Sequence, residues 1–109
     1  MKHAKELSIR ESLTEIVNRI VEVAQPDQII LFGSAARREM TEESDIDLLV
    51  VKSNTHRRHL AQLIYQNLIG VGVPVDIIVA TPEDLQTYQH SIGLIYEPAL
   101  TDGEVIYDK

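Results

Sequence analysis

Residues 31–50, which read LFGSAARREMTEESDIDLLV, carry the motifs that decide the fold. The stretch opens at the end of Gln28–Phe32, a short apolar run that predicts a buried strand. Gly33 and Ser34 follow at once and predict a sharp turn that leads into a helix. Such a turn presents backbone N–H groups and a hydroxyl at the positive end of a helix dipole, which suits a triphosphate, and Arg37 adds a positive charge nearby.

Two carboxylates stand at the start of the next apolar run. Asp45 and Asp47 are two residues apart on the strand predicted around Ile46–Val51, so their side chains share one face of the sheet. A third acid, Asp76, interrupts the otherwise apolar run Pro74–Ala80, another predicted strand. Two carboxylates about 4 Å apart repel by roughly 4 kcal/mol at an effective dielectric constant near 20, so clustering three of them is unfavourable unless a cation lies between them. Oxygen ligands beside a phosphate site indicate Mg²⁺.

Helical patterns fill the segments between these strands. Apolar residues recur every three or four positions in the first and third of the predicted helices, and the fourth has a threonine N-cap followed by proline. Helices are predicted over residues 12–24, 35–40, 54–68, from Thr81 onward, and over 89–100, with a closing strand over 104–107. Strands that alternate with helices predict an α/β fold, a sheet covered by helices.

The composition narrows the classes of function. The chain has 109 residues, enough for one domain, and its 10 Lys and Arg against 17 Asp and Glu give a net charge of -7, which argues against tight nucleic-acid binding. The absence of cysteine excludes disulfides, thiolate metal sites and cysteine nucleophiles. No secretory signal and no apolar run of about 20 residues is present, so we expect a cytoplasmic protein that does not enter a membrane.

Taken together, the motifs resemble those of the minimal nucleotidyltransferases, or MNT domains, of the DNA polymerase β-like superfamily. The family signature is Gly-Ser, ten residues, Asp-x-Asp and a later acid. Gly33 and Ser34 followed by Asp45 and Asp47 match this spacing, and Asp76 stands in the expected place. The resemblance implies a small mixed β-sheet flanked by helices, the polymerase β-like palm fold, with residues 1–109 as a single minimal nucleotidyltransferase domain.

The resemblance also implies a role for each motif residue, under a two-metal mechanism with two Mg²⁺ ions per site. Asp45 and Asp47 would hold the Mg²⁺ that is bound to the triphosphate of ATP and would share the second ion. Asp76 would bind the second ion and help to deprotonate the acceptor hydroxyl. The residues that bind the nucleotide would be Gly33, Ser34 and Arg37.

Stand-alone members of the family are typically paired with a helical HEPN protein, often an RNase toxin, and neutralise it by transferring AMP onto a tyrosine. The resemblance therefore implies a protein adenylyltransferase that acts as the antitoxin of a HEPN partner. Two alternatives stay open: an idle antitoxin that inhibits by binding alone, and a nucleotidyltransferase for a small molecule. The intact acids count against the first, and the lack of an acceptor-binding domain counts against the second.

Two further features have simpler interpretations. The sequence His56-Arg57-Arg58-His59 places two histidines three residues apart, but no further ligand at metal spacing accompanies them, which favours a solvated helix start. The four tyrosines, Tyr65, Tyr88, Tyr96 and Tyr107, are interpreted as core or rim residues, any exposed one being a possible acceptor for self-modification.

Overall fold

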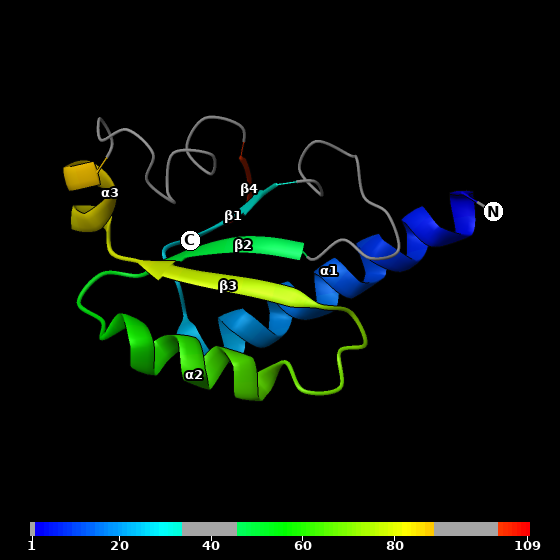
Figure 1. The fold of residues 1–109 in the computed structure, drawn as a ribbon, viewed down its shortest axis with the longest axis horizontal. Helices are drawn as coiled ribbons and strands as arrows, with labels where there is room; N and C mark the ends of the chain where they lie inside the picture. Colours follow the sequence, from blue (N-terminus) through cyan, green and yellow to red (C-terminus); the bar gives the residue numbers. More distant parts are fainter. Residues whose placement is uncertain (1, 34–45, 89–102) are drawn as a thin grey trace.

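The computed structural model describes residues 2–33, 46–88 and 103–109, which form a four-stranded sheet and three helices (Figure 1). The elements in chain order are α1 (Lys2–Ala24), β1 (Gln28–Phe32), β2 (Ile46–Val51), α2 (Arg57–Asn67), β3 (Val75–Ala80), α3 (Pro82–Tyr88) and β4 (Glu104–Asp108). All four strands and three helices that the sequence predicts in this part of the chain are therefore present.

The sheet is mixed, as the family resemblance implied. Its strand order is β3-β2-β1-β4, in which β1 pairs antiparallel with both β2 and β4, and β2 pairs parallel with β3. The parallel pair is joined through α2, the crossover that parallel pairing requires. This order leaves β3 and β4 at the two edges.

Helices α1 and α2 cover one face of the sheet and form the main core with it (Figure 1). The apolar stripes of the two helices supply its fully or almost fully buried side chains, which pack against alternate residues of the strands. These residues are Ile16 and Ile20 of α1, Leu60 and Ile64 of α2, and Ile29, Leu31, Ile46, Leu48, Val50, Ile77 and Val79 of the sheet. Burial of one such side chain contributes about 1.5–3 kcal/mol, so this face holds most of the hydrophobic stabilisation.

The opposite face carries a smaller core. Ile30, Leu49, Val51 and Ala80 are buried there, and Leu85 of α3 packs against them. The central strands β1 and β2 are thus covered on both faces, which explains why their sequences are apolar apart from Gln28 and Asp47.

Two helices begin at other residues than predicted. Helix α1 begins at Lys2, about three turns before the predicted start, and α2 begins at Arg57 rather than near Asn54. Asn54 has a positive φ of 53°, and His56 is the N-cap, its Nδ1 accepting a hydrogen bond from His59 N at 3.2 Å. The turn before α2 therefore uses Asn54 in the left-handed region, which asparagine tolerates.

Helix α3 begins where the sequence predicts. Thr81 Oγ1 accepts a hydrogen bond from Asp84 N at 3.0 Å, and Asp84 Oδ2 accepts one from Thr81 N at 2.9 Å. This reciprocal pair is a capping box. The helices predicted over 35–40 and 89–100 lie outside the described residues. Within the described part of the chain, no helix combines the length and apolar character needed to cross a membrane.

Candidate active site

The register of the parallel strands places two of the predicted carboxylates next to each other. Asp47 and Asp76 are the second residues of β2 and β3 and are paired across the two strands. Adjacent strands lie about 4.8 Å apart. Their neighbours Leu48 and Ile77 point into the core under α1 and α2, so both aspartates point to the opposite face. Asp47 is half-buried and Asp76 is exposed.

The turn after β1 lies directly against Asp47. Phe32, the last residue of β1, pairs with Asp47, and the next residue, Gly33, has a positive φ of 73°. A Cβ atom on Gly33 would overlap Asp47 Oδ2, so a side chain at this position has no space. Glycine is therefore required twice, by the backbone conformation and by the close approach of the carboxylate.

Tyr65 is a third side chain at this site, which sequence analysis did not assign to it. Its hydroxyl accepts a hydrogen bond from Ile77 N at 2.8 Å and donates one to Asp76 Oδ1 at 3.2 Å. Burial of the hydroxyl is the main cause that raises the pKa of Tyr65; the charge of Asp76 and the hydrogen bond to it raise it further, and the Ile77 amide acts against them. The hydroxyl therefore keeps its proton at neutral pH and donates a hydrogen bond to Asp76.

The donor set fits the cation that the sequence predicts. Two carboxylates from adjacent strands offer hard oxygen ligands on one face, and such ligands suit Mg²⁺. Asp45 directly precedes β2, but it lies outside the described residues, as do Ser34 and Arg37. Within the described ranges, no group of three His, Cys, Asp or Glu side chains could hold a metal ion. Asp47 and Asp76 are thus the two predicted ligands that the structure brings together.

The basic segment His56-Arg57-Arg58-His59 forms the start of α2, as its sequence favoured. His56 caps the helix, and Arg57 Nη1 forms an ion pair with Asp84 Oδ2 of α3 at 3.3 Å. These contacts link the starts of α2 and α3.

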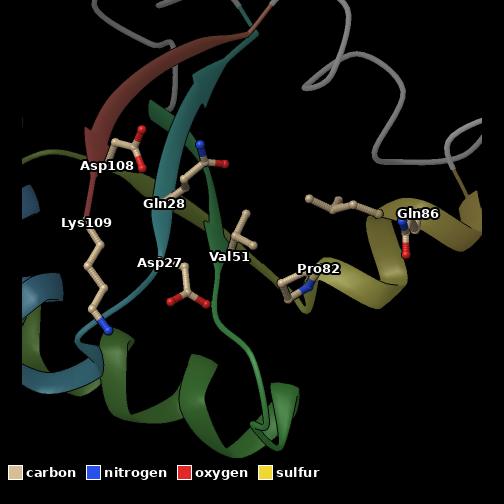
Figure 2. A pocket seen from close by; sticks show the side chains of 8 residues that line it. Asp27, Gln28, Val51, Pro82, Gln86, Asp108 and Lys109 are labelled. Carbon is tan, nitrogen blue, oxygen red and sulfur yellow. The ribbon is translucent and has the colours of Figure 1, made fainter.

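A pocket of about 740 Å³ opens at the other end of the sheet (Figure 2). It is lined by residues at the start of β1, the ends of β2 and β4, and α3, among them Gln28, Val51 and Pro82. Asp27 lies at this pocket, and its carboxylate accepts a hydrogen bond from Ser53 N at 2.9 Å, which is the main cause that lowers its pKa. Of the predicted site residues that the structure describes, which are Gly33, Asp47 and Asp76, none lines this pocket.

A known protein family matches most of this chain. The family described as "Polymerase beta, Nucleotidyltransferase" matches residues 11–109. The chain therefore belongs to the polymerase beta nucleotidyltransferase family.

Two proteins of known sequence are similar to this chain. Two proteins of Methanocaldococcus jannaschii, both named "putative protein adenylyltransferase", are 34% and 36% identical over 87 and 81 residues, which are 74% and 73% of this chain. The chain spans 58% of the first relative and 77% of the second.

Two solved structures share the fold. A structure titled "putative nucleotidyltransferase" from Sulfolobus solfataricus has a TM-score of 0.66 and 21% identity, covering 97% of this chain and 87% of the other. A toxin–antitoxin structure with AMP-PNP has a TM-score of 0.59 and 19% identity, covering 87% of this chain and 73% of the other.

Proposed function

We propose that this chain is a Mg²⁺-dependent nucleotidyltransferase that transfers AMP from ATP to a tyrosine hydroxyl of a HEPN toxin and thereby acts as its antitoxin. The observation that carries the proposal is the pairing of Asp47 with Asp76 beside Gly33, in a chain of the polymerase beta nucleotidyltransferase family. The names of the two relatives support a protein acceptor. The toxin–antitoxin structure with AMP-PNP supports a toxin partner and an adenine nucleotide.

In the proposed reaction, Asp76 acts as the base. The acceptor oxygen attacks the α-phosphorus of ATP, the bond from this phosphorus to the bridging oxygen breaks, and pyrophosphate leaves with the electron pair. Asp76 is the exposed carboxylate and takes the proton of the acceptor hydroxyl. Bound Mg²⁺ supplies the positive charge that neutralises the triphosphate.

The other residues of the proposed site bind the metal ion and the phosphates of ATP. Asp47, whose carboxylate lies against Gly33, is proposed as a metal ligand. Asp45 is proposed as the third ligand, and Gly33, Ser34 and Arg37 as the group that binds the phosphates of ATP.

The charge of the chain supports a basic partner. A net charge of -7 complements a protein that binds RNA, because opposite potentials accelerate association. A HEPN RNase has this property, since its substrate is a polyanion.

The test combines the chain with the HEPN protein expected from the neighbouring reading frame, ATP and Mg²⁺. The mass of the partner should rise by a multiple of AMP, and fragment mass spectrometry should place the addition on a tyrosine. Asp76→Asn should reduce transfer by at least about 10²-fold, yet keep AMP-PNP binding and an equal or higher melting temperature. The amide relieves the repulsion between neighbouring carboxylates, and its oxygen can still accept the hydrogen bond from Tyr65, so we expect no loss of stability.

Three other outcomes would contradict the proposal. Full neutralisation of the toxin by Asp47→Asn would support inhibition by binding alone. AMP on a small molecule and never on the partner would support the small-molecule enzyme. A less stable Asp76→Asn variant with unchanged turnover would make Asp76 a structural acid.

A further inference from the structure

The hydroxyl of Tyr65 connects the backbone of β3 to the carboxylate of Asp76. Its oxygen accepts the N–H of Ile77 at 2.8 Å, and its proton is donated to Asp76 Oδ1 at 3.2 Å. The side chain comes from α2, which packs on the face of the sheet opposite to Asp76, and it is 43% exposed. Tyr65 thus reaches Asp76 from the other layer of the fold.

The position of β3 at the sheet edge makes this contact possible. The strand order begins with β3, so one side of this strand has no neighbouring strand in the described sheet. The amide of Ile77 faces this side, since its acceptor is Tyr65 rather than a residue of β2. A hydroxyl bound to the backbone keeps its place when side chains rotate, so it is a fixed donor for the carboxylate.

The contact engages one of the two carboxylate oxygens. Oδ1 of Asp76 accepts the hydrogen bond from Tyr65, so within the described part of the chain the second oxygen, Oδ2, remains open to a ligand. Mg²⁺ demands near-ideal octahedral geometry, so a carboxylate fixed in one orientation is a better ligand than one that rotates. Groups that orient metal ligands in this way are typically worth about 10–100-fold in metal affinity or activity.

We propose that Tyr65 is a positioning residue, which holds Asp76 by Oδ1 and so fixes the orientation in which this carboxylate would bind a metal ion and receive the acceptor proton. The proposal rests on the proposed function, because it takes Asp76 as a metal ligand. Tyr65 touches Asp76 and the backbone of β3 and acts through this carboxylate.

The first test measures metal binding without turnover. Mn²⁺ is titrated by calorimetry into the protein with AMP-PNP, comparing wild type, Tyr65→Phe, Asp76→Asn and the double variant. Tyr65→Phe should weaken Mn²⁺ binding by about 10–100-fold, and the double variant should bind like Asp76→Asn alone. Tyr107→Phe, a hydroxyl removal at the other edge of the sheet on β4, should match wild type.

Two results would overturn the proposal. One is wild-type Mn²⁺ affinity in Tyr65→Phe. The other is a double variant in which adding Tyr65→Phe to Asp76→Asn weakens Mn²⁺ binding as much as Tyr65→Phe does alone. Tyr65 would then act independently of the carboxylate. If Tyr65→Phe does not fold, Asp76→Glu keeps Tyr65 and the negative charge but moves the carboxylate by one methylene. This variant should then lose Mn²⁺ affinity by a similar factor, and wild-type affinity would contradict the proposal.

A second test uses the transfer reaction. Tyr65→Phe should lower kcat by about 10–100-fold and leave the KM for ATP within about twofold, because the interaction serves the reacting centre rather than nucleotide binding. If wild type transfers no AMP, the proposed function fails, whereas the Mn²⁺ titrations still decide whether Tyr65 positions Asp76.

Discussion

The backbone conformation at residue 33 and the neighbouring Asp47 carboxylate both require glycine at this position. The φ of 73° at Gly33 costs a residue with a side chain about 1–2 kcal/mol, and a Cβ atom would also overlap Asp47 Oδ2. Gly33→Ala should therefore lower stability in urea unfolding by about that amount or more and displace the Asp47 carboxylate. Calorimetry with AMP-PNP and Mg²⁺ should show a clear loss of affinity.

Gly72→Ala is the matched control. Gly72 has a φ of 87°, but a Cβ atom there meets nothing within 4 Å. The Gly72→Ala variant should lose stability only because alanine disfavours this positive φ, and it should bind the nucleotide like wild type. Equal nucleotide affinity in both variants would remove Gly33 from the site.

Asp27 makes a pH-dependent contribution to the stability of the fold. The hydrogen bond from Ser53 N holds its pKa below the ordinary value of 3.8. A carboxyl whose pKa is lower in the folded state stabilises the fold above its unfolded pKa, and this contribution disappears as the pH falls through the folded pKa.

The melting temperature of Asp27→Asn should therefore be lower than that of wild type at pH 6, with a difference that shrinks below about pH 4. Thermal unfolding across the pH range measures it, and Glu83→Gln, which removes an exposed acid on α3, is the control. A difference that stays constant with pH would mean that the charge of Asp27 is irrelevant to the fold.

The residues of the site were predictable to different degrees. Asp47 and Asp76 could be found because acids within apolar strand sequences are conspicuous, and strand alternation assigns them to a face. Tyr65 could not be found in this way. Its contact depends on the rotation of α2 about its axis and on β3 being an edge strand, and no pattern in the sequence encodes either.

At the scale of elements, the capping box of α3 is the clearest local determinant. Thr81 and Asp84 satisfy each other's backbone N–H groups at the start of a seven-residue helix, which has few hydrogen bonds of its own. Thr81→Ala should cost about 1 kcal/mol in urea unfolding. Gln86→Ala, an exposed change on the same helix, should stay within about 0.5 kcal/mol of wild type. Equal losses would show that the cap is dispensable.

The boundaries of the elements show where sequence patterns fail. The strands begin and end within a residue of prediction because each is a short apolar run bounded by turn residues. Helix α1 begins earlier because Ala4, Lys5 and Leu7 are good helix formers, although charged residues interrupt the apolar pattern there. Helix propensity without an apolar periodicity is only a weak indication of a helix, so the first three turns of α1 were not predicted.

At the scale of the molecule, the sheet topology places the site. Both aspartates stand at the starts of parallel strands, and the turn after β1 meets Asp47 because β1 runs antiparallel to β2. The alternation of elements predicts a layered α/β fold. Only the family resemblance implied that the sheet is mixed, because pairing direction depends on contacts between segments far apart in sequence.

Binding of Mg²⁺ at a specific site can be distinguished from the general screening of negative charges in an acidic molecule. At a net charge of -7, any salt reduces self-repulsion and raises the melting temperature somewhat. A bound ion adds stability by linkage, about 1.4 kcal/mol at a tenfold excess over its Kd, which corresponds to a rise of roughly 5–10 °C for a domain of this size. Millimolar MgCl₂ should therefore raise the melting temperature of wild type more than NaCl of equal ionic strength does.

The excess that Mg²⁺ produces over NaCl should depend on Asp76 and not on charge in general. Asp76→Asn and Glu83→Gln each remove one negative charge from an exposed side chain, but only Asp76 lies beside Asp47. Thermal unfolding should show that Asp76→Asn loses most of the excess and that Glu83→Gln retains it. If wild type responds to both salts equally, or both variants lose the excess alike, the acidic pair does not form a Mg²⁺ site, and the carboxylates of β2 and β3 need another explanation.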